Sequence, residues 1–172
     1  MGTVTYKHQP GIHKTRGTVP LAGTSHVYTV DKVLWPEEVE QFIATLFIGR
    51  TLHLCSGASK LGDIRFDSDS KHMPDLIGDA AHTGLVSESF DTVLCDPPYN
   101  GKFQWNHDVL NEMARLAKYR IVFQHWFMPI RPDGHFKKWV ERWALSAVYV
   151  WQPRTYFGRV QVISVLDRCD LS

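Results

Sequence analysis

Residues 89–103 end in a group of side chains that can hold a ligand. Their sequence, SFDTVLCDPPYNGKF, begins as a hydrophobic strand and then changes to an acid, two prolines and a tyrosine. Asp96 can accept hydrogen bonds, whereas Pro97 and Pro98 each fix the backbone φ angle and lack an amide N–H. A carboxylate and a backbone carbonyl are therefore held in a fixed direction, with no competing donor beside them.

A second candidate segment, CSGASKLGD, follows an earlier apolar run and begins at Cys55. Its glycine spacing is that of a phosphate-binding loop, but Asp63 stands where the lysine of such a loop belongs, which excludes that function. The pattern Gly57-x-Ser59-x-x-Gly62 is nearer to a dinucleotide-binding fingerprint, with serine in place of the second glycine. An ordinary turn explains the segment equally well.

Two acids at the ends of the next predicted strands support the dinucleotide-binding interpretation over an ordinary turn. Asp67 ends the strand after the glycine segment, where a carboxylate can accept two ribose hydroxyls. Asp79 ends the following one, where it can meet an adenine amino group. Because ligands bind at the carboxyl ends of strands in open α/β sheets, these residues are expected to share one edge of a sheet.

Periodicity predicts the elements that position these residues. Apolar residues between Pro36 and Gly49 recur with the spacing of a helix that has one buried face. Residues 106–117 predict an Asn-capped helix, and Asp133 begins another with Trp139 and Trp143 on its apolar face. Strands are predicted at RTLHLCSG, DIRFDSD, PDLIGDA, FDTVLC and YRIVFQH, and two more joined by a turn at SAVYVWQPRTYFGRVQVISVLD.

The tetrapeptide DPPY at residues 96–99 resembles the catalytic motif of class I S-adenosylmethionine-dependent amino-methyltransferases, the family of the DPPY-type DNA adenine-N6 methyltransferases. The order of motifs is similar from about Trp35 to Val165. The resemblance implies a Rossmann-like α/β fold with a mostly parallel seven-stranded sheet and a C-terminal antiparallel hairpin. It also implies S-adenosyl-L-methionine as the cofactor and no metal.

The resemblance also implies a role for each matching residue. The Asp96 carboxylate and the Pro97 carbonyl would accept the two N–H bonds of an amino group, Pro98 would hold the turn, and Tyr99 would stack on a flipped base. The cofactor would be bound by residues at the four strand ends: Cys55, Ser56, Gly57, Ser59, Asp67, Asp79, Ala80 and Asp96.

The sequence departs from this family in two ways. Only eight residues separate Cys55 from Ile64, and only seven separate Asp67 from Asp75, so the first two crossover helices must shrink to single turns or loops. A second copy of the chain could cover the sheet face that this leaves thinly covered. No segment is long enough for a target-recognition region, so recognition must come from loops, from a partner chain or from low selectivity.

Candidate substrate contacts follow from position in the chain. These residues could bind phosphates or bases of a substrate. For each lone basic residue, the alternative is that it belongs to an ordinary solvated surface. For Trp139 and Trp143, and for His53 inside the first strand, packing in the core is the simpler explanation. The candidates are Asn100, Lys102 and Trp105 after the tetrapeptide, His125 and Trp126 after the fifth strand, and Arg154 and Arg159 at the last turn.

Composition fits one folded domain. Of the 172 residues, 44% are hydrophobic and 22% are charged, which are ordinary values for a protein with a core. Residues 1–30 contain three basic and no acidic residues, and we expect them to form an extended arm. We expect residues 31–172 to form a single catalytic domain.

The three cysteines suggest neither a disulfide framework nor a zinc site. The absence of a long apolar run and of a signal-like start predicts a cytoplasmic protein with no membrane partner.

Charge is distributed unevenly along the chain, although the net charge is only +1. Residues 31–100 carry twelve acidic and five basic side chains, whereas residues 101–172 carry six and eleven. An acidic middle with basic ends suits a small cationic or hydroxyl-rich ligand at the centre and a polyanion around it. The alternative is an ordinary solvated surface.

The resemblance implies methylation of a nucleic-acid amino group, with adenine N6 in DNA preferred. An RNA base or cytosine N4 is the alternative within the enzyme class, and a non-catalytic nucleic-acid-binding subunit is the alternative outside it. The family places its first and fourth strands side by side, so Cys55 and Cys95 are expected to be neighbouring, reduced thiols.

Overall fold

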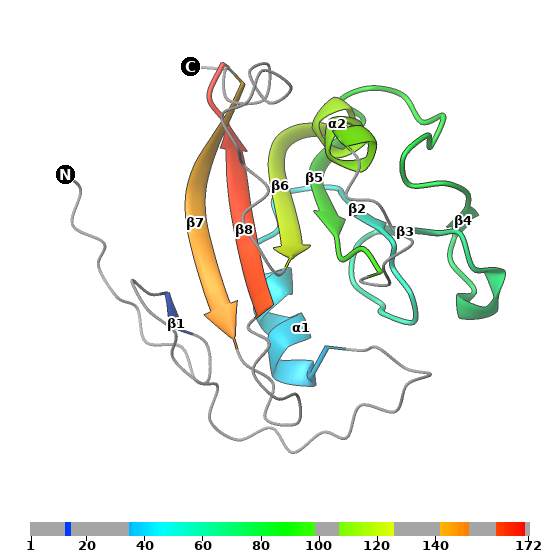
Figure 1. Cartoon of the computed structure of the whole chain (residues 1–172), viewed down its shortest axis with the longest axis horizontal. Coiled ribbons are helices and arrows are strands. Elements are labelled where there is room, and N and C mark those ends of the chain that lie inside the picture. The colour runs from blue at the N-terminus through cyan, green and yellow to red at the C-terminus, as the bar shows by residue number, and fades with distance from the viewer. Residues whose placement is uncertain (1–12, 15–34, 99–106, 126–141, 152–160, 171–172) are drawn as a thin grey trace.

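The described part of the protein folds as one mixed sheet with a helix on each face (Figure 1). In this computed structural model the structure describes residues 13–14, 35–98, 107–125, 142–151 and 161–170. The helical elements are α1 (Glu37–Ala44), the single 3-10 turn η1 (Ser70–His72) and α2 (His107–Leu116). The strands are β1 (His13–Lys14), β2 (Thr51–Leu54), β3 (Ile64–Asp67), β4 (Leu76–Ile77), β5 (Phe90–Cys95), β6 (Ala117–His125), β7 (Trp143–Trp151) and β8 (Gln161–Arg168).

The sheet has the strand order β1-β7-β8-β6-β5-β2-β3-β4, which can be followed from left to right in Figure 1. Strands β4, β3, β2, β5 and β6 are parallel, and β8 runs antiparallel to both β6 and β7. The predicted mostly parallel seven-stranded sheet with a C-terminal antiparallel hairpin is confirmed. The two-residue β1 adds an eighth strand, antiparallel to β7.

The central strands are buried on both faces, which explains their continuous apolar sequences. On one face, Val93 and Ile121 belong to the core that contains Met113 of α2. On the other, Leu94 and Val122 belong to the core that contains Ile43 of α1. Successive residues of β5 and β6 thus pack against opposite helices, because side chains alternate along a strand.

The first two crossovers lack full helices, as the sequence predicts. Residues 55–63 join β2 to β3 as a loop, and η1 is the only helical turn between β3 and β4. Apolar side chains are exposed near β4 as a result: Met73 is 72% exposed and Ile77 64%. Neither described α-helix is long enough to cross a membrane, and none of the described helices is a candidate span.

Two helix predictions need correction. The first helix ends at Ala44 rather than at Gly49, which has a φ of +55° and lies just before β2. Trp143 does not lie on a helix face, because it is the first residue of β7 and pairs with Arg168 of β8. Its side chain is buried in the core on the α2 side, so aromatic burial in a strand produced the apolar pattern. Residues 126–141, which hold the rest of that predicted helix, lie outside the described part of the chain.

Candidate active site

The predicted binding residues that the structure describes follow strands whose carboxyl ends share one edge of the sheet. Leu54 pairs with Cys95, and Cys95 pairs with Phe123, so β2, β5 and β6 end side by side. Asp67, at the end of β3, pairs with Ile77, at the end of β4. The loops after these five parallel strands therefore begin at the same edge, where α/β proteins bind ligands.

The loop after β2 is tied to β3 by its backbone. Cys55 and Gly57 have positive φ angles of 54° and 50°. The Ser56 amide donates to the Phe66 carbonyl at 3.2 Å, and the Gly57 amide donates to Oδ2 of Asp67 at 2.7 Å. A Cβ atom added at Gly57 would meet nothing within 4 Å, so the loop is open at that residue.

Side chains from α1 and β2 hold the rest of this loop. The buried Ser59 hydroxyl donates to Oε1 of Glu40 at 2.8 Å and accepts from the Leu61 amide at 3.2 Å. The Nδ1 of His53 lies 3.2 Å from the Leu61 carbonyl, and the imidazole stacks on Trp35. No sequence pattern pointed to Glu40, which lies 19 residues before Ser59. Ser59 remains a predicted cofactor residue, but its hydroxyl is already used inside the protein.

The protonation state of His53 decides whether Nδ1 is the donor in its hydrogen bond with the Leu61 carbonyl. Burial lowers the pKa of His53 to about 4, so the ring is neutral near pH 7. Since the Leu61 carbonyl can only accept, Nδ1 carries the proton and donates it. The core position expected for His53 is confirmed, because the residue is 1% exposed.

Asp67 accepts two backbone hydrogen bonds, one on each carboxylate oxygen. Its Oδ2 accepts from Gly57 at 2.7 Å, and its Oδ1 accepts from the Asp69 amide at 2.8 Å. Each oxygen has a second lone pair, so the carboxylate can still accept hydroxyl groups from a ligand. Asp69 is itself the N-cap of η1, where it accepts from the Lys71 amide at 2.9 Å.

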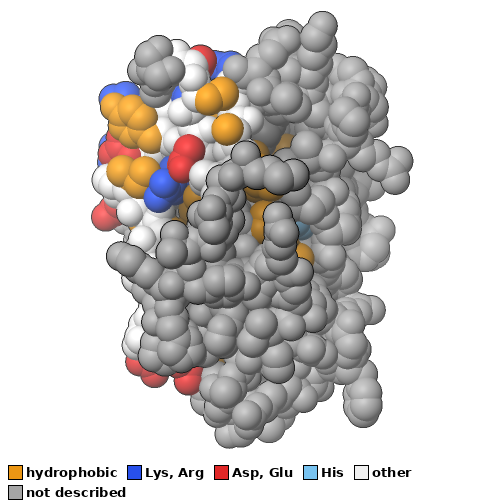
Figure 2. Space-filling model, turned by 90° about the vertical axis from the view of Figure 1, so that its left-hand side faces the viewer, with side chains coloured by type: hydrophobic (Ala, Val, Ile, Leu, Met, Phe, Trp, Pro, Cys, Tyr) orange, Lys and Arg blue, Asp and Glu red, His pale blue; other side chains and the backbone are white. Residues whose placement is uncertain are grey.

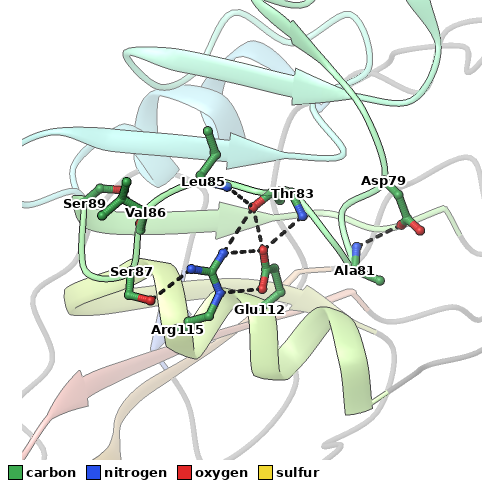
Figure 3. Close-up of polar contacts among 9 residues, drawn as sticks. All are labelled: Asp79, Ala81, Thr83, Leu85, Val86, Ser87, Ser89, Glu112 and Arg115. Atoms are coloured by element: carbon green, nitrogen blue, oxygen red, sulfur yellow. Dashed lines mark hydrogen bonds and ion pairs between the residues drawn. The ribbon is translucent and has the colours of Figure 1, made fainter.

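The loop that carries Asp79 is held by a polar cluster on α2 (Figure 3). Glu112 accepts from the amide and the hydroxyl of Thr83, at 3.0 and 2.5 Å, and from Nε of Arg115 at 2.8 Å. Burial would raise the pKa of Glu112, but the hydrogen bonds from Arg115 and Thr83 lower it overall. Asp79 accepts from the Ala81 amide at 2.9 Å, and its side chain is exposed.

Cys55 and Cys95 are neighbours at this edge, as the strand order predicts. Cys95 ends β5 and pairs with Leu54, the residue before Cys55. Both thiols are reduced, and Cys95 is fully buried. Burial is the main cause that raises the pKa of Cys95, and a hydrogen bond with the Cys55 side chain adds to it. The predicted role as a small apolar residue therefore suits Cys95 better than a thiolate does.

The described part of the tetrapeptide begins directly after β5. Asp96 is partly buried, Pro97 is buried and Pro98 is exposed. His125, which ends β6, is completely buried, and its Nε2 lies 2.7 Å from the Ser164 hydroxyl. A substrate contact by His125 remains a prediction. The other predicted catalytic and substrate residues lie outside the described ranges: Tyr99, Asn100, Lys102, Trp105, Trp126, Arg154 and Arg159.

Comparison with known proteins identifies the fold. No family model and no curated protein sequence match the chain. Among solved structures, TrmN from Thermus thermophilus is similar over 77% of this chain, with a TM-score of 0.54 and 20% identity. The chain has the class I methyltransferase fold. It spans about half of TrmN, since the match covers 48% of that protein.

Two further methyltransferase structures share this fold. Magnesium protoporphyrin IX methyltransferase from Synechocystis PCC 6803, solved with bound SAM, is 13% identical, with a TM-score of 0.53 over 77% of this chain and 79% of its own. A Pyrococcus abyssi tRNA (uracil-54, C5)-methyltransferase, solved with S-adenosyl-L-homocysteine, is 16% identical. The TM-score is 0.53, and the match covers 75% of this chain and 36% of the Pyrococcus abyssi protein.

The site of the present chain has the features that such a cofactor requires. The loop is open at Gly57, so a ligand can approach the backbone there. Asp67 has spare acceptor capacity, and the Asp79 carboxylate is exposed. These groups match the hydroxyls and the amino group of an adenosine, so the described residues fit S-adenosylmethionine.

Proposed function

We propose that this protein is an S-adenosylmethionine-dependent methyltransferase that modifies an exocyclic amino group of a nucleic-acid base, preferably adenine N6 in DNA. One observation carries the proposal: Asp96 follows the strand adjacent to the one that leads into the Gly57 loop. The carboxylate of a DPPY tetrapeptide thus lies next to the loop that fits the cofactor.

The proposed roles follow from hydrogen-bonding capacity. The lone pair of an adenine amino nitrogen is delocalised into the ring, so two acceptors must turn the amino group out of conjugation before it can attack. Asp96 and the carbonyl of Pro97 are those acceptors, and Pro98 keeps the turn rigid. Tyr99 supplies a stacking surface for the base, worth about 1–3 kcal/mol. The cofactor supplies a methyl group on a positively charged sulfur.

The cofactor contacts are divided among four strand ends. The backbone of Cys55, Ser56 and Gly57 lines the approach to the sulfur-bearing part of the ligand. Asp67 accepts hydrogen bonds from the ribose hydroxyls, and Asp79 with Ala80 receives the adenine. Ser59 acts through its hydrogen bond to Glu40, which fixes the loop. Cys95 fills space beneath the site as an uncharged thiol.

Charge supports a nucleic acid as the substrate. The three segments that follow β5, β6 and β7, residues 99–106, 126–141 and 152–160, together carry six basic and two acidic side chains. All three continue from strand ends at the edge of the candidate site, because β7 runs parallel to β6. Basic segments around an acidic centre suit phosphate contacts at the rim.

The described framework uses several of its basic side chains in ion pairs. Its buried or half-buried arginines are paired, as in Arg65 with Asp75, Arg115 with Glu112 and Arg120 with Asp167. On the described part of the face in Figure 2, acidic and basic side chains are mixed with apolar ones at the upper end, and acidic side chains gather at the lower end. We therefore expect the proposed nucleic-acid contact at the site edge.

RNA is the second candidate substrate. One protein of the same fold, from Pyrococcus abyssi, is a tRNA methyltransferase. Cytosine N4 remains the alternative amino group. A homodimer or a partner chain would supply further recognition contacts.

The deciding experiment measures methyl transfer from labelled S-adenosylmethionine to DNA and to RNA by the purified full chain. We expect label in DNA, recovered as N6-methyladenine after digestion to nucleosides. Label in RNA alone would select the second candidate. Cofactor binding with no transfer to either nucleic acid would favour the non-catalytic subunit and contradict the enzyme.

A further inference from the structure

The crossover from β4 to β5, residues 78–89, contains no helix and is held in place by side chains of α2 (Figure 3). Glu112 lies at the centre of these contacts and is only 8% exposed. Its Oε1 accepts hydrogen bonds from the amide and the hydroxyl of Thr83, at 3.0 and 2.5 Å, and from Nη2 of Arg115 at 2.6 Å. A carboxylate that is buried to this extent costs free energy unless donors and a cation compensate it, and these contacts do so.

Arg115 contributes contacts from the next turn of α2. Its Nε donates to Oε2 of Glu112 at 2.8 Å, so the guanidinium bonds both carboxylate oxygens. Its Nη1 donates to the Ser87 hydroxyl at 3.0 Å, and its backbone carbonyl accepts from the Glu88 amide at 2.8 Å. We call Glu112, Arg115 and Thr83 the loop clamp. Two side chains of one helix therefore hold the crossover at Thr83 and again four residues later.

Asp79 lies between the loop clamp and a second anchor on β3. Gly78, the residue before it, donates its amide to the Asp67 carbonyl at 3.0 Å. A Cβ atom added at Gly78 would lie 2.6 Å from Cζ of Phe66, so the backbone runs directly against that ring. On the other side, Thr83 follows Asp79 by four residues and is fixed by the loop clamp. The position of the Asp79 backbone is therefore set by β3 on one side and by α2 on the other.

Hydrogen bonds within residues 79–83 extend this anchoring to the Asp79 side chain. Oδ1 of Asp79 accepts from the Ala81 amide at 2.9 Å, and the Asp79 carbonyl accepts from the His82 amide at 3.0 Å. These bonds form one turn, which leads into Thr83. The Asp79 side chain is 71% exposed, and its Oδ2 lies 3.6 Å from Nδ1 of His82. Since the carboxylate is not packed in the core, its direction depends on how firmly the turn is held.

We propose that Glu112 is a positioning residue for recognition of the cofactor's adenine, because the loop clamp fixes the turn that directs the Asp79 carboxylate at the 6-amino group. This inference rests on the proposed function and deepens it. A carboxylate accepts well only when the N–H bond points at its oxygen, since hydrogen bonds weaken steeply away from linearity. A turn released from α2 would lose this alignment. The proposed ribose contact would be less affected, because Asp67 is held by separate backbone hydrogen bonds.

The test compares two ligands that differ only in the purine ring. S-adenosylhomocysteine has the 6-amino group, whereas S-inosylhomocysteine has a carbonyl there, which would place an acceptor opposite the Asp79 carboxylate. The wild-type full chain should bind S-adenosylhomocysteine about ten- to a hundredfold more tightly in titration calorimetry. The ratio of the two dissociation constants separates alignment from stability, because a merely structural role of Glu112 would weaken both ligands by the same factor.

Glu112→Gln and Thr83→Val each remove part of the loop clamp with little change in volume. The first removes the charge that holds Arg115, and the second removes the hydroxyl that donates to Glu112. We expect the preference for S-adenosylhomocysteine to fall to about threefold or less in both variants. Thr83→Val provides the result if Glu112→Gln fails to fold. Asp79→Ala, which lacks the proposed acceptor, should lose the preference as well.

Asp167→Asn is the matched control for Glu112→Gln. Asp167 of β8 also accepts from an arginine through both carboxylate oxygens, in this case from Arg120 of β6 at 2.6 and 3.0 Å. Arg120 lies in the first half of β6, away from the carboxyl end at the candidate site. Asp167→Asn should therefore lower the melting temperature and keep the wild-type ratio of dissociation constants.

The expected pattern is a lost preference in Glu112→Gln and Thr83→Val and a retained preference in Asp167→Asn. If the first two variants keep the wild-type ratio, or if the control loses it too, the positioning role is wrong and the proposed function stands. A wild type that binds both ligands equally would overturn this inference and the adenine role of Asp79, but not methyl transfer. A wild type that binds neither ligand would overturn the proposed cofactor and this inference together.

Discussion

The carboxylate of Asp67 accepts a hydrogen bond from the amide of Gly57 at 2.7 Å, joining the end of β3 to the open loop after β2. A second hydrogen bond, from the Asp69 amide, occupies its other oxygen. Asp67 therefore fixes the loop and keeps lone pairs for a ligand.

Asp67→Ala should weaken cofactor binding for two reasons. It removes the proposed acceptor of the ribose hydroxyls, and it leaves the Gly57 amide without its acceptor. A hydrogen-bonded charged group is worth about 1.5–3 kcal/mol, so we expect the Kd for S-adenosylhomocysteine to rise about ten- to a hundredfold. Titration calorimetry measures this directly. Asp108→Ala, in the exposed first turn of α2, is the control. Unchanged affinity in Asp67→Ala would transfer the ribose role, most simply to Asp69.

Glu40→Ala tests whether α1 positions the cofactor loop. The change leaves the buried Ser59 hydroxyl without its acceptor, so we expect a loss of about 1–3 kcal/mol in the free energy of unfolding. Cofactor affinity should fall as well, because the loop loses an anchor. Glu38→Ala is the matched control, since Glu38 is exposed in the first turn of the same helix. Equal stability and equal cofactor affinity in the two variants would show that the Glu40 hydrogen bond does not hold the loop.

The buried His53 should make the folded protein less stable in acid. Burial lowers its pKa from 6.5 in the unfolded chain to about 4 in the folded protein. Between these two values the unfolded chain binds more protons, so stability falls as the pH drops from 6.5 towards 4. In His53→Gln that part of the pH dependence should disappear. Melting temperatures at pH 7 and pH 4.5 provide the comparison, with the exposed His82→Gln as control. Identical acid losses in wild type and His53→Gln would contradict the assignment.

The strands themselves and the reduced crossovers were predictable because they depend on local pattern and chain length. Eight residues between Cys55 and Ile64 leave no room for a helix, whatever the sequence between them. The pairing of Leu54 with Cys95 follows from the order of strands that the tetrapeptide implies. Hydrophobic periodicity was sufficient for the strands, whereas their order came from the family resemblance.

Contacts between distant side chains were not predictable in the same way. Glu40 and Ser59 belong to different elements, and neither residue type nor spacing marks them as partners. The same is true of Gln124 and Gln161, which are 37 residues apart. Trp143 was misassigned because an aromatic residue that is buried in a strand satisfies a helical pattern when the preceding residues also fit it.

The central claim is that Asp96 accepts the amino group that receives the methyl. Asp96→Ala removes this acceptor and leaves Asp67 and Asp79, which are proposed to hold the cofactor. The account predicts that kcat for methyl transfer falls by about 10²–10³-fold or more, while the Kd for S-adenosylhomocysteine changes little. Asp108→Ala, tested in parallel, should retain wild-type values for both. Near-normal turnover by Asp96→Ala would contradict the amino-methyltransferase mechanism.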